Sequence, residues 1–296
     1  MHHGILALLA ERSNLTAIGA HDGMTARLGQ NAGFDAIWGS GFEIAASFGV
    51  PDANILTMTD QLRQCDIIAQ AVDIPIIADC DNGFGNAINA AVTTRMFERH
   101  GIAGICIEDN EFPKKCSFYE GVQRNLVPLR EHALKIRACK EAQTDPDFFV
   151  IARTEALIAG NGIQEALDRA YAYAEAGADA VLVHSKQPVS DELVTFAEKW
   201  DSAVPLVAVP TTYDRVSAQE LHELGYRIVI FANQAMRSSI KAIEENLRLL
   251  RADGRSSILR DRMVSLEHVF DLVGVKELRR DEALYLRGAA EELLTS

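Results

Sequence analysis

The 296-residue sequence lacks the features that define several common functional classes. It has no apolar run near the ~20 residues of a membrane-spanning helix. The short apolar run near its N-terminus meets Glu11 and Arg12 at once, unlike a signal peptide. Basic residues are outnumbered, with 29 Lys and Arg against 42 Asp and Glu and a net charge of −13. This balance argues against nucleic acid or an anionic membrane surface as a partner.

Cysteine patterns of disulfide-rich or zinc-binding proteins are also missing. The chain has five cysteines, at positions 65, 80, 106, 116 and 139. Their number is odd and none are spaced as CxxC, so we expect reduced thiols in a cytoplasmic protein. No Rossmann glycine fingerprint follows the first apolar run and no P-loop occurs, which weakens the case for a doubly wound open sheet.

What the chain does contain is a regular alternation of short apolar runs and amphipathic segments. Continuous Val-, Ile- and Ala-rich runs are typical of strands buried on both faces. We expect eight strands, at 16–20, 35–39, 74–79, 103–109, 148–153, 179–185, 204–210 and 227–232. We expect amphipathic helices between them, at 57–72, 87–100, 129–142, 163–177 and 233–252. These units predict one (β/α)₈ barrel of the TIM type over residues 1–253.

Residues 254–296 form a separate helical extension in this interpretation. Helices are expected at 263–273 and 276–294, and no further strand follows. The extension carries Leu, Val and Phe side chains, while the completed barrel has no face left for them to cover. We therefore expect it to pack on a neighbouring subunit.

Candidate reactive residues cluster where the expected strands end, as in TIM barrels generally. Asp79, Asp81 and Glu108 follow or end neighbouring strands, where their charges would repel one another without a cation. An all-oxygen ligand set suits Mg²⁺, with Mn²⁺ as the alternative. The competing interpretation is that these carboxylates cap helices or pair with Arg153 and nearby lysines.

Three further side chains suggest chemistry. Arg153 can form a bidentate fork to carboxylate or phosphoryl oxygens, or simply neutralise acidic neighbours. His184 suits an acid, a base or an orienting donor, although hydrogen-bonded structural histidines are equally common. Cys116 follows Lys114 and Lys115, two cations that would lower the pKa of its thiol. The other four cysteines are typical of packing residues.

The motifs that contain these residues resemble those of one enzyme superfamily. They are WGSGFE (38–43), VPDANIL (50–56), DCDNGFGN (79–86), IEDNEFPKKCS (107–117), the run 135–156, AGADAVLVHSK (177–186) and VPTTY (209–213). In this order they are similar to the isocitrate lyase/phosphoenolpyruvate mutase superfamily, specifically its phosphoenolpyruvate mutase and phosphonopyruvate hydrolase branch. The resemblance implies a helix-swapped barrel that assembles as a homodimer or homotetramer. It also implies Mg²⁺ and a small phosphonate or 2-oxo acid as substrate.

The resemblance also implies roles for individual residues. Asp79 would ligate the metal directly, while Asp81 and Glu108 would bind metal-bound waters. The residues expected to act in the chemistry are Asp52, Lys114, Cys116, Ser117, Arg153 and His184. The residues expected to bind substrate are Trp38, Ser40, Gly41, Phe42 and Asn110.

Two positions depart from the mutase signature, which reads Glu-Asp-Lys, five residues, then Asn-Ser. Here Asn110 replaces the Lys and Cys116 replaces the Asn. A cysteine there is similar to the C–C lyases, in which it protonates an enolate, but Ser117 and Phe118 replace their Gly-His. We expect a Mg²⁺-dependent P–C bond enzyme of the phosphoenolpyruvate phosphomutase type. The alternatives are a phosphonopyruvate hydrolase, a C–C lyase of a small 2-hydroxy or 2-oxo dicarboxylate, and a barrel that binds a metabolite without turnover.

Overall fold

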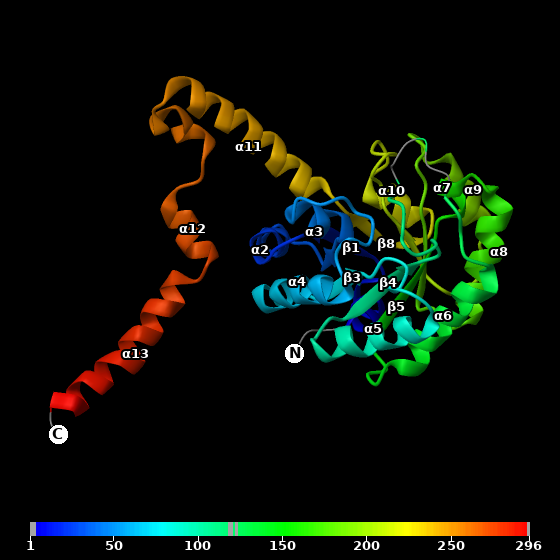
Figure 1. Cartoon of the computed structure of the whole chain (residues 1–296), viewed down its shortest axis with the longest axis horizontal. Helices are drawn as coiled ribbons and strands as arrows, with labels where there is room; N and C mark the ends of the chain where they lie inside the picture. The colour runs from blue at the N-terminus through cyan, green and yellow to red at the C-terminus, as the bar shows by residue number, and fades with distance from the viewer. Residues whose placement is uncertain (1–3, 118–120, 122–123, 295–296) are drawn as a thin grey trace. The chain divides into compact units, whose positions relative to one another are not determined.

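Eight parallel strands form a closed barrel in the order of the sequence (Figure 1). The structure is a computed structural model that describes residues 4–117, 121 and 124–294. The strands are β1 (Leu15–Ala20), β2 (Ala36–Gly39), β3 (Ile76–Asp79), β4 (Gly104–Glu108), β5 (Phe149–Thr154), β6 (Ala180–Val183), β7 (Leu206–Ala208) and β8 (Tyr226–Phe231). β8 closes on β1, where Leu15 lies opposite Ile228. The predicted (β/α)₈ barrel is confirmed, and the alternative of an open sheet is wrong.

Helices connect the strands and cover the outside of the barrel. They are α2 (Gly23–Asn31), α3 (Gly41–Ser47), α4 (Met58–Ala71), α5 (Ala87–Arg99), α6 (Leu129–Ala142), α7 (Ala156–Ala159), α8 (Gly162–Glu175), α9 (Asp191–Lys199) and α10 (Ala218–Glu223). A longer helix, α11 (Gln234–Asp253), follows β8. The five helices predicted from amphipathic patterns agree with the structure to within two residues at each end. The helices α3 and α7 are only seven and four residues long, too short for a helical period to show in the sequence.

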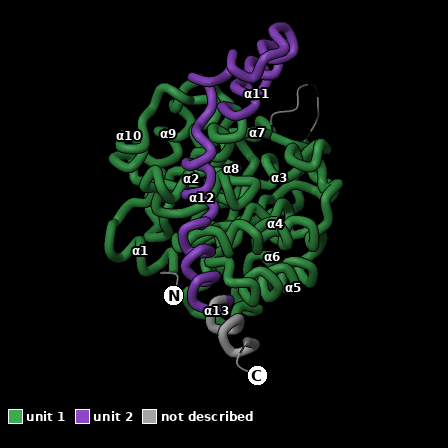
Figure 2. Tube along the Cα trace, turned by 90° about the vertical axis from the view of Figure 1, so that its left-hand side faces the viewer, with its two compact units in different colours: residues 1–237 green, residues 238–296 purple. Residues whose placement is uncertain are grey.

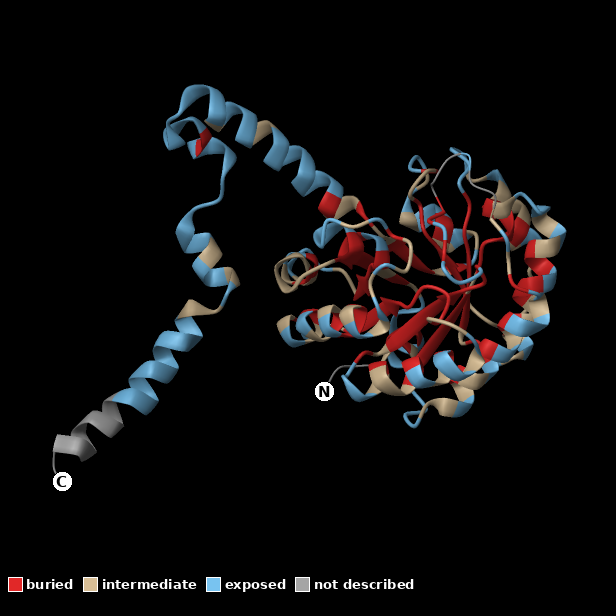
Figure 3. Cartoon of the chain, viewed as in Figure 1, coloured by how far each residue is buried: buried red, intermediate tan, exposed pale blue. Residues whose placement is uncertain are grey.

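Burial explains why the strands are apolar along their whole length. In β4, Ile105 packs outward against the helices while Cys106 packs into the barrel interior, so both faces of the strand are buried. Figure 3 shows the barrel strands as largely buried, together with parts of the surrounding helices. Cys65, Cys80, Cys106 and Cys139 are all buried and unoxidised, as expected of packing residues.

A helix that the sequence pattern did not predict, α1 (Ile5–Arg12), precedes the first strand. Its Ile5, Leu8 and Leu9 belong to the same apolar cluster as interior barrel residues such as Leu15 and Phe149, which lie at strand starts. This helix therefore covers the end of the barrel where the strands begin. The opposite end, where the strands finish, is the one available for a functional site.

The chain forms two compact units, residues 1–237 and 238–296 (Figure 2). The second unit contains most of α11, the 3₁₀ helix η1 (Ser256–Arg262), α12 (Leu266–Leu272) and α13 (Val275–Leu294). Several of its apolar side chains are exposed, including Leu266 and Leu278, at 72% and 57%. The domain limit at 253 and the packing on a second subunit stay predictions. Among the described residues, no helix has the length and apolarity needed to cross a membrane.

Candidate active site

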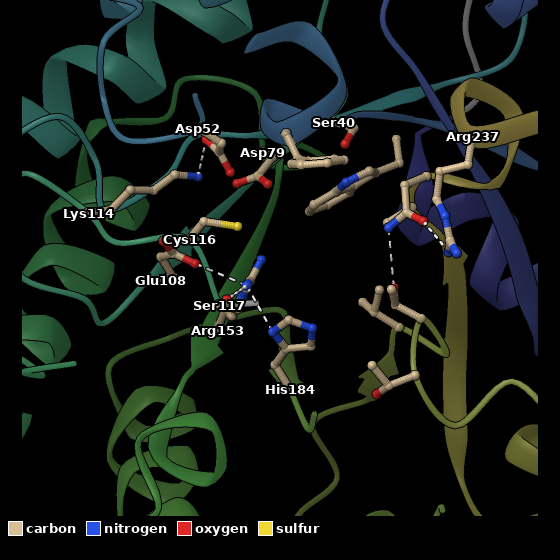
Figure 4. Close-up of a pocket in the computed structure, with 17 residues that line it drawn as sticks. Ser40, Asp52, Asp79, Glu108, Lys114, Cys116, Ser117, Arg153, His184 and Arg237 are labelled. Carbon is tan, nitrogen blue, oxygen red and sulfur yellow. Dashed lines mark hydrogen bonds and ion pairs between the residues drawn. The ribbon is translucent and has the colours of Figure 1, made fainter. Parts of the chain in front are cut away.

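A cavity of about 350 Å³ opens where the barrel strands end, a size typical of small-molecule sites (Figure 4). Eleven of the fourteen predicted site residues line it: Trp38, Ser40, Phe42, Asp52, Asp79, Glu108, Lys114, Cys116, Ser117, Arg153 and His184. The other three lie directly behind this lining: Gly41, Asp81 and Asn110. A Cβ on Gly41 would meet Asp81 Oδ1 at 3.2 Å, and Asn110 Nδ2 donates to Glu108 Oε1 at 3.0 Å.

One wall of the cavity is acidic. Asp79 and Glu108 end β3 and β4, and Asp81 follows in a tight turn at a left-handed φ of 50°. Burial raises the pKa of Asp81 to about 7, although Lys114 opposes the shift. Burial also raises the pKa of Glu108 to about 7, here against the opposing charge of Arg153. The neighbouring cations therefore do not fully offset the effect of burial on these two carboxylates.

Lys114 is the cation closest to this wall. Its Nζ is 2.9 Å from Asp52 Oδ1 and also contacts Asp81 Oδ1. Burial alone would lower the Lys114 pKa, but Asp81 and Asp52 raise it well above its usual value. Asn54, which the sequence did not single out, links the Lys114 backbone to Asp81. Its Oδ1 accepts the Lys114 backbone N–H at 2.6 Å, and its Nδ2 donates to Asp81 Oδ2 at 2.8 Å.

The second wall is organised by Glu155, another residue absent from the predicted site. This fully buried carboxylate accepts from Arg153 Nε at 2.7 Å and from Ser117 Oγ at 2.6 Å, and lies 2.8 Å from His184 Nδ1. Arg153 Nη2 in turn donates to Ser117 Oγ at 2.9 Å and lies 3.2 Å from Glu108 Oε2. Burial raises the pKa of Glu155, but Arg153 and His184 outweigh it and hold that pKa well below its usual range.

Burial lowers the pKa of His184 and the charge of Arg153 lowers it further, whereas Glu155 raises it. Arg153 neutralises Glu108 and Glu155 and also lines the cavity, and its role as a fork for substrate oxygens stays a prediction. Helix capping by the acidic wall is wrong: the helices that start nearby are capped by Ser40 and Asn86 instead. Glu155 was detectable only as a further strand-end carboxylate, two residues after Arg153.

The third wall was also missed as a site. It comprises Thr211 and Thr212 after β7, and Asn233 and Arg237 around the start of α11. Asn233 Oδ1 accepts from Arg237 Nη1 at 3.3 Å. Figure 4 shows Arg237 across the cavity from Lys114, so the two cations lie on opposite sides. The VPTTY motif was the sequence signal for this wall, but no role attaches to it from residue types alone.

The family model described as phosphoenolpyruvate phosphomutase matches residues 5–251. The chain belongs to the phosphoenolpyruvate phosphomutase family. This match spans all eight strands and every wall of the cavity, and it confirms the resemblance found in the motifs.

Relatives in this family include both a hydrolase and a mutase. A phosphonopyruvate hydrolase from Variovorax sp. (strain Pal2) is 44% identical over 273 residues, covering 92% of this chain and 94% of the relative. A crystal structure of phosphoenolpyruvate phosphomutase from Streptomyces platensis subsp. rosaceus has a TM-score of 0.94 at 44% identity, covering 96% and 100% of the two chains. A phosphonopyruvate hydrolase crystallised with oxalate and Mg²⁺ has a TM-score of 0.89 at 43% identity, covering 95% and 97%.

The donor set suits the divalent ion that the family implies. Within the part of the chain that the structure describes, no three Asp, Glu, His or Cys side chains converge for direct ligation of one ion. Mg²⁺ does not require this, because it usually keeps several waters and takes only one or two carboxylates. Asp79 and Glu108 face one cavity, all of the donors are oxygen, and two of the three carboxylates have raised pKa values.

Proposed function

We propose that this chain is a Mg²⁺-dependent P–C bond enzyme of the phosphoenolpyruvate phosphomutase type, interconverting phosphoenolpyruvate and phosphonopyruvate. One observation carries the proposal: a single cavity joins the acidic wall at Asp79 and Glu108 to the cluster of Arg153, Ser117 and His184. A substrate with a pyruvyl group at one end and a phosphoryl group at the other matches this division.

At the acidic wall, Asp79 would hold Mg²⁺ directly, with Asp81 and Glu108 acting through bound water. When bound, the ion supplies Lewis-acid polarisation of the pyruvyl oxygens, which stabilises enolate charge. Asn110 supports this wall by donating to Glu108, and Asn54 supports it by donating to Asp81.

The pyruvyl group would lie against Trp38 and the start of α3. Trp38 is nearly fully buried in the barrel and lines the cavity floor. Ser40, Gly41 and Phe42 follow it, and the Ser40 Oγ that caps α3 fixes this segment by accepting the Glu43 N–H at 3.3 Å. These three residues would bind the pyruvyl carboxylate and the enolate oxygen.

The phosphoryl group would lie between Arg153, Ser117 and Lys114. A loose phosphoryl-transfer transition state spreads charge over three peripheral oxygens, and fixed donors stabilise it without reorganising. Arg153 is such a donor, because Glu155 holds its Nε and Ser117 accepts from its Nη2. Asp52 faces the Lys114 ammonium at 2.9 Å and would keep it at the reacting phosphoryl group.

Two other activities share these residues. Hydrolysis is supported by the 44% identity with a phosphonopyruvate hydrolase, and differs only in that water captures the phosphoryl group. C–C lysis is supported by the Cys116 side chain on the cavity wall, where it could act as an acid.

³¹P NMR of the full-length protein with Mg²⁺ and phosphonopyruvate separates these activities. Growth of the phosphoenolpyruvate signal supports the mutase, and growth of inorganic phosphate with equimolar pyruvate supports the hydrolase. An unchanged spectrum, together with turnover of a carbon-only dicarboxylate, would refute P–C chemistry.

A further inference from the structure

A second group of buried polar side chains lies behind the wall that Glu155 organises. Asp109 directly follows Glu108 at the end of β4, and Arg169 and Tyr173 lie one turn apart on α8. Asp109 Oδ2 accepts from the Tyr173 hydroxyl at 2.8 Å and from Arg169 Nη1 at 3.2 Å. Its other oxygen, Oδ1, accepts the backbone N–H of Glu155 at 2.8 Å. We call Asp109, Arg169 and Tyr173 the rear cluster.

The rear cluster also holds the loop that carries Lys114, Cys116 and Ser117. Arg169 Nη1 donates to the carbonyl oxygen of Val127 at 3.0 Å, and the Val127 N–H donates to the Asp109 carbonyl at 2.9 Å. Just beyond this point, the Glu111 N–H donates to the Asn125 carbonyl at 3.3 Å. Both ends of the loop are therefore fastened beside Asp109.

Glu155 is the point at which the loop and the barrel meet. Ser117 reaches it from the loop, while Arg153 and His184 reach it from β5 and from the end of β6. Asp109 bonds both to the backbone of Glu155 and to the closing end of the loop. A displacement of Asp109 would therefore move Ser117 relative to Arg153.

Stability alone does not account for charged groups in this position. A buried ion pair loses hydration on folding, and apolar side chains of similar volume often replace one without loss of stability. Arg169 and Asp109 are nevertheless both nearly fully buried. Directed hydrogen bonds, which apolar packing cannot supply, fix orientation.

We propose that the rear cluster is a positioning device that sets the loop residue Ser117 against Arg153 and His184, acting through Glu155. This inference rests on the proposed P–C chemistry, in which these groups hold the phosphoryl group. In the mutase direction from phosphonopyruvate, the C–P bond breaks and a P–O bond to the enolate oxygen forms. In hydrolysis, the new P–O bond is to water, and the enolate carbon takes up a proton. The position of Ser117 biases this partition.

Tyr173→Phe is the test, because it removes one hydroxyl and leaves the ring and the Asp109–Arg169 pair in place. The matched control is Tyr226→Phe, since Tyr226 is equally buried and its hydroxyl donates to the Leu193 carbonyl at 2.9 Å, away from Glu155 and the loop. The readouts are kcat, KM, the melting temperature, and the ratio of phosphoenolpyruvate to inorganic phosphate formed from phosphonopyruvate by the full-length enzyme with Mg²⁺.

We expect Tyr173→Phe to lower kcat about tenfold with little change in KM, because small misplacements of reacting groups carry large rate costs. The share of inorganic phosphate should rise. Tyr226→Phe should lose comparable thermal stability and keep both kcat and the product ratio. Arg169→Lys should resemble Tyr173→Phe, because it retains the charge but not the planar guanidinium, whose Nε reaches Glu165 while its Nη1 reaches Asp109 and Val127.

The proposal fails if Tyr173→Phe and Arg169→Lys both keep kcat and the product ratio within about twofold of the parent. It also fails if Tyr226→Phe changes them equally. A parent enzyme that is inert towards phosphonopyruvate refutes the proposed function instead. The same three variants are then compared on the dicarboxylate that the parent does cleave, where equal kcat values would refute the positioning role.

Discussion

Glu155→Gln is the substitution that probes the site most directly. The wild-type carboxylate accepts from Arg153 Nε at 2.7 Å and from Ser117 Oγ at 2.6 Å, and meets His184 Nδ1 at 2.8 Å. Glutamine keeps the shape and one acceptor oxygen, but it carries no negative charge. Whichever way its amide turns, the charge-assisted pairing with Arg153 is lost.

The expected cost follows from these contacts. A hydrogen bond to a charged group contributes ~1.5–3 kcal/mol, and a buried charge left without its partner costs ~3–5 kcal/mol. Arg153 keeps one carboxylate, Glu108 at 3.2 Å, so the loss should lie at about 3 kcal/mol. A fixed donor to developing charge is worth ~10²–10³ in kcat, and we expect a loss of about 10²-fold.

Urea unfolding and ³¹P-monitored turnover measure the two effects, with Asp179→Asn as the control. Asp179 Oδ2 also accepts two hydrogen bonds, from Lys140 at 2.7 Å and from the Val150 N–H at 2.8 Å, but it does not line the cavity. The control should therefore lose stability without losing kcat. A Glu155→Gln enzyme with kcat within about twofold of the parent would refute the reasoning.

Three further predictions concern the metal, the thiol and the helical extension. Asp79→Ala should abolish turnover, whereas Asp81→Ala and Glu108→Ala should lose less; activity that survives exhaustive chelation would contradict a metal role. Because the pKa of Asp81 and of Glu108 is raised to about 7, both take up protons as the pH falls through 7, so calorimetry should show weaker Mg²⁺ binding at pH 6 than at pH 8. Cys116→Ser and Cys116→Asn should stay active in P–C chemistry, whereas a fall of ~10²–10⁴-fold in dicarboxylate cleavage would identify the thiol as an acid. Truncation at 253 should give aggregate or an unstable monomer, and a soluble, active monomer by light scattering would contradict the subunit contact.

The sequence predicted the barrel well because a strand that is buried on both faces has a continuous apolar sequence, which is easily recognised. Strand β6 lies within its predicted range. The helix α1 was missed, since its eight residues were weighed only as a targeting segment and the interior cluster it joins comes from distant strands. Local periodicity cannot report such a long-range contact.

Site residues were predictable where chemistry shows in residue type and strand position, as for Asp79 and Arg153. Asn54 and Glu155 were not, because their roles depend on partners far along the chain. Asn54 meets Lys114 sixty residues away, from a backbone at a left-handed φ of 54°. The sequence left open whether the carboxylates pair with cations, and the structure places Lys114 and Arg153 against them.

The closure of β1 on β8 has a consequence for synthesis of the protein. Leu15 reaches its strand partner Ile228 only after all of the intervening strands have been translated. Until then the edge of β1 stays unpaired, and unpaired edges recruit other strands. The interior face of α1 must also wait for late strands before it is covered. Barrel closure therefore waits for the last strand and has high contact order, and chains halted before β8 expose two unpaired sheet edges, which favours aggregation.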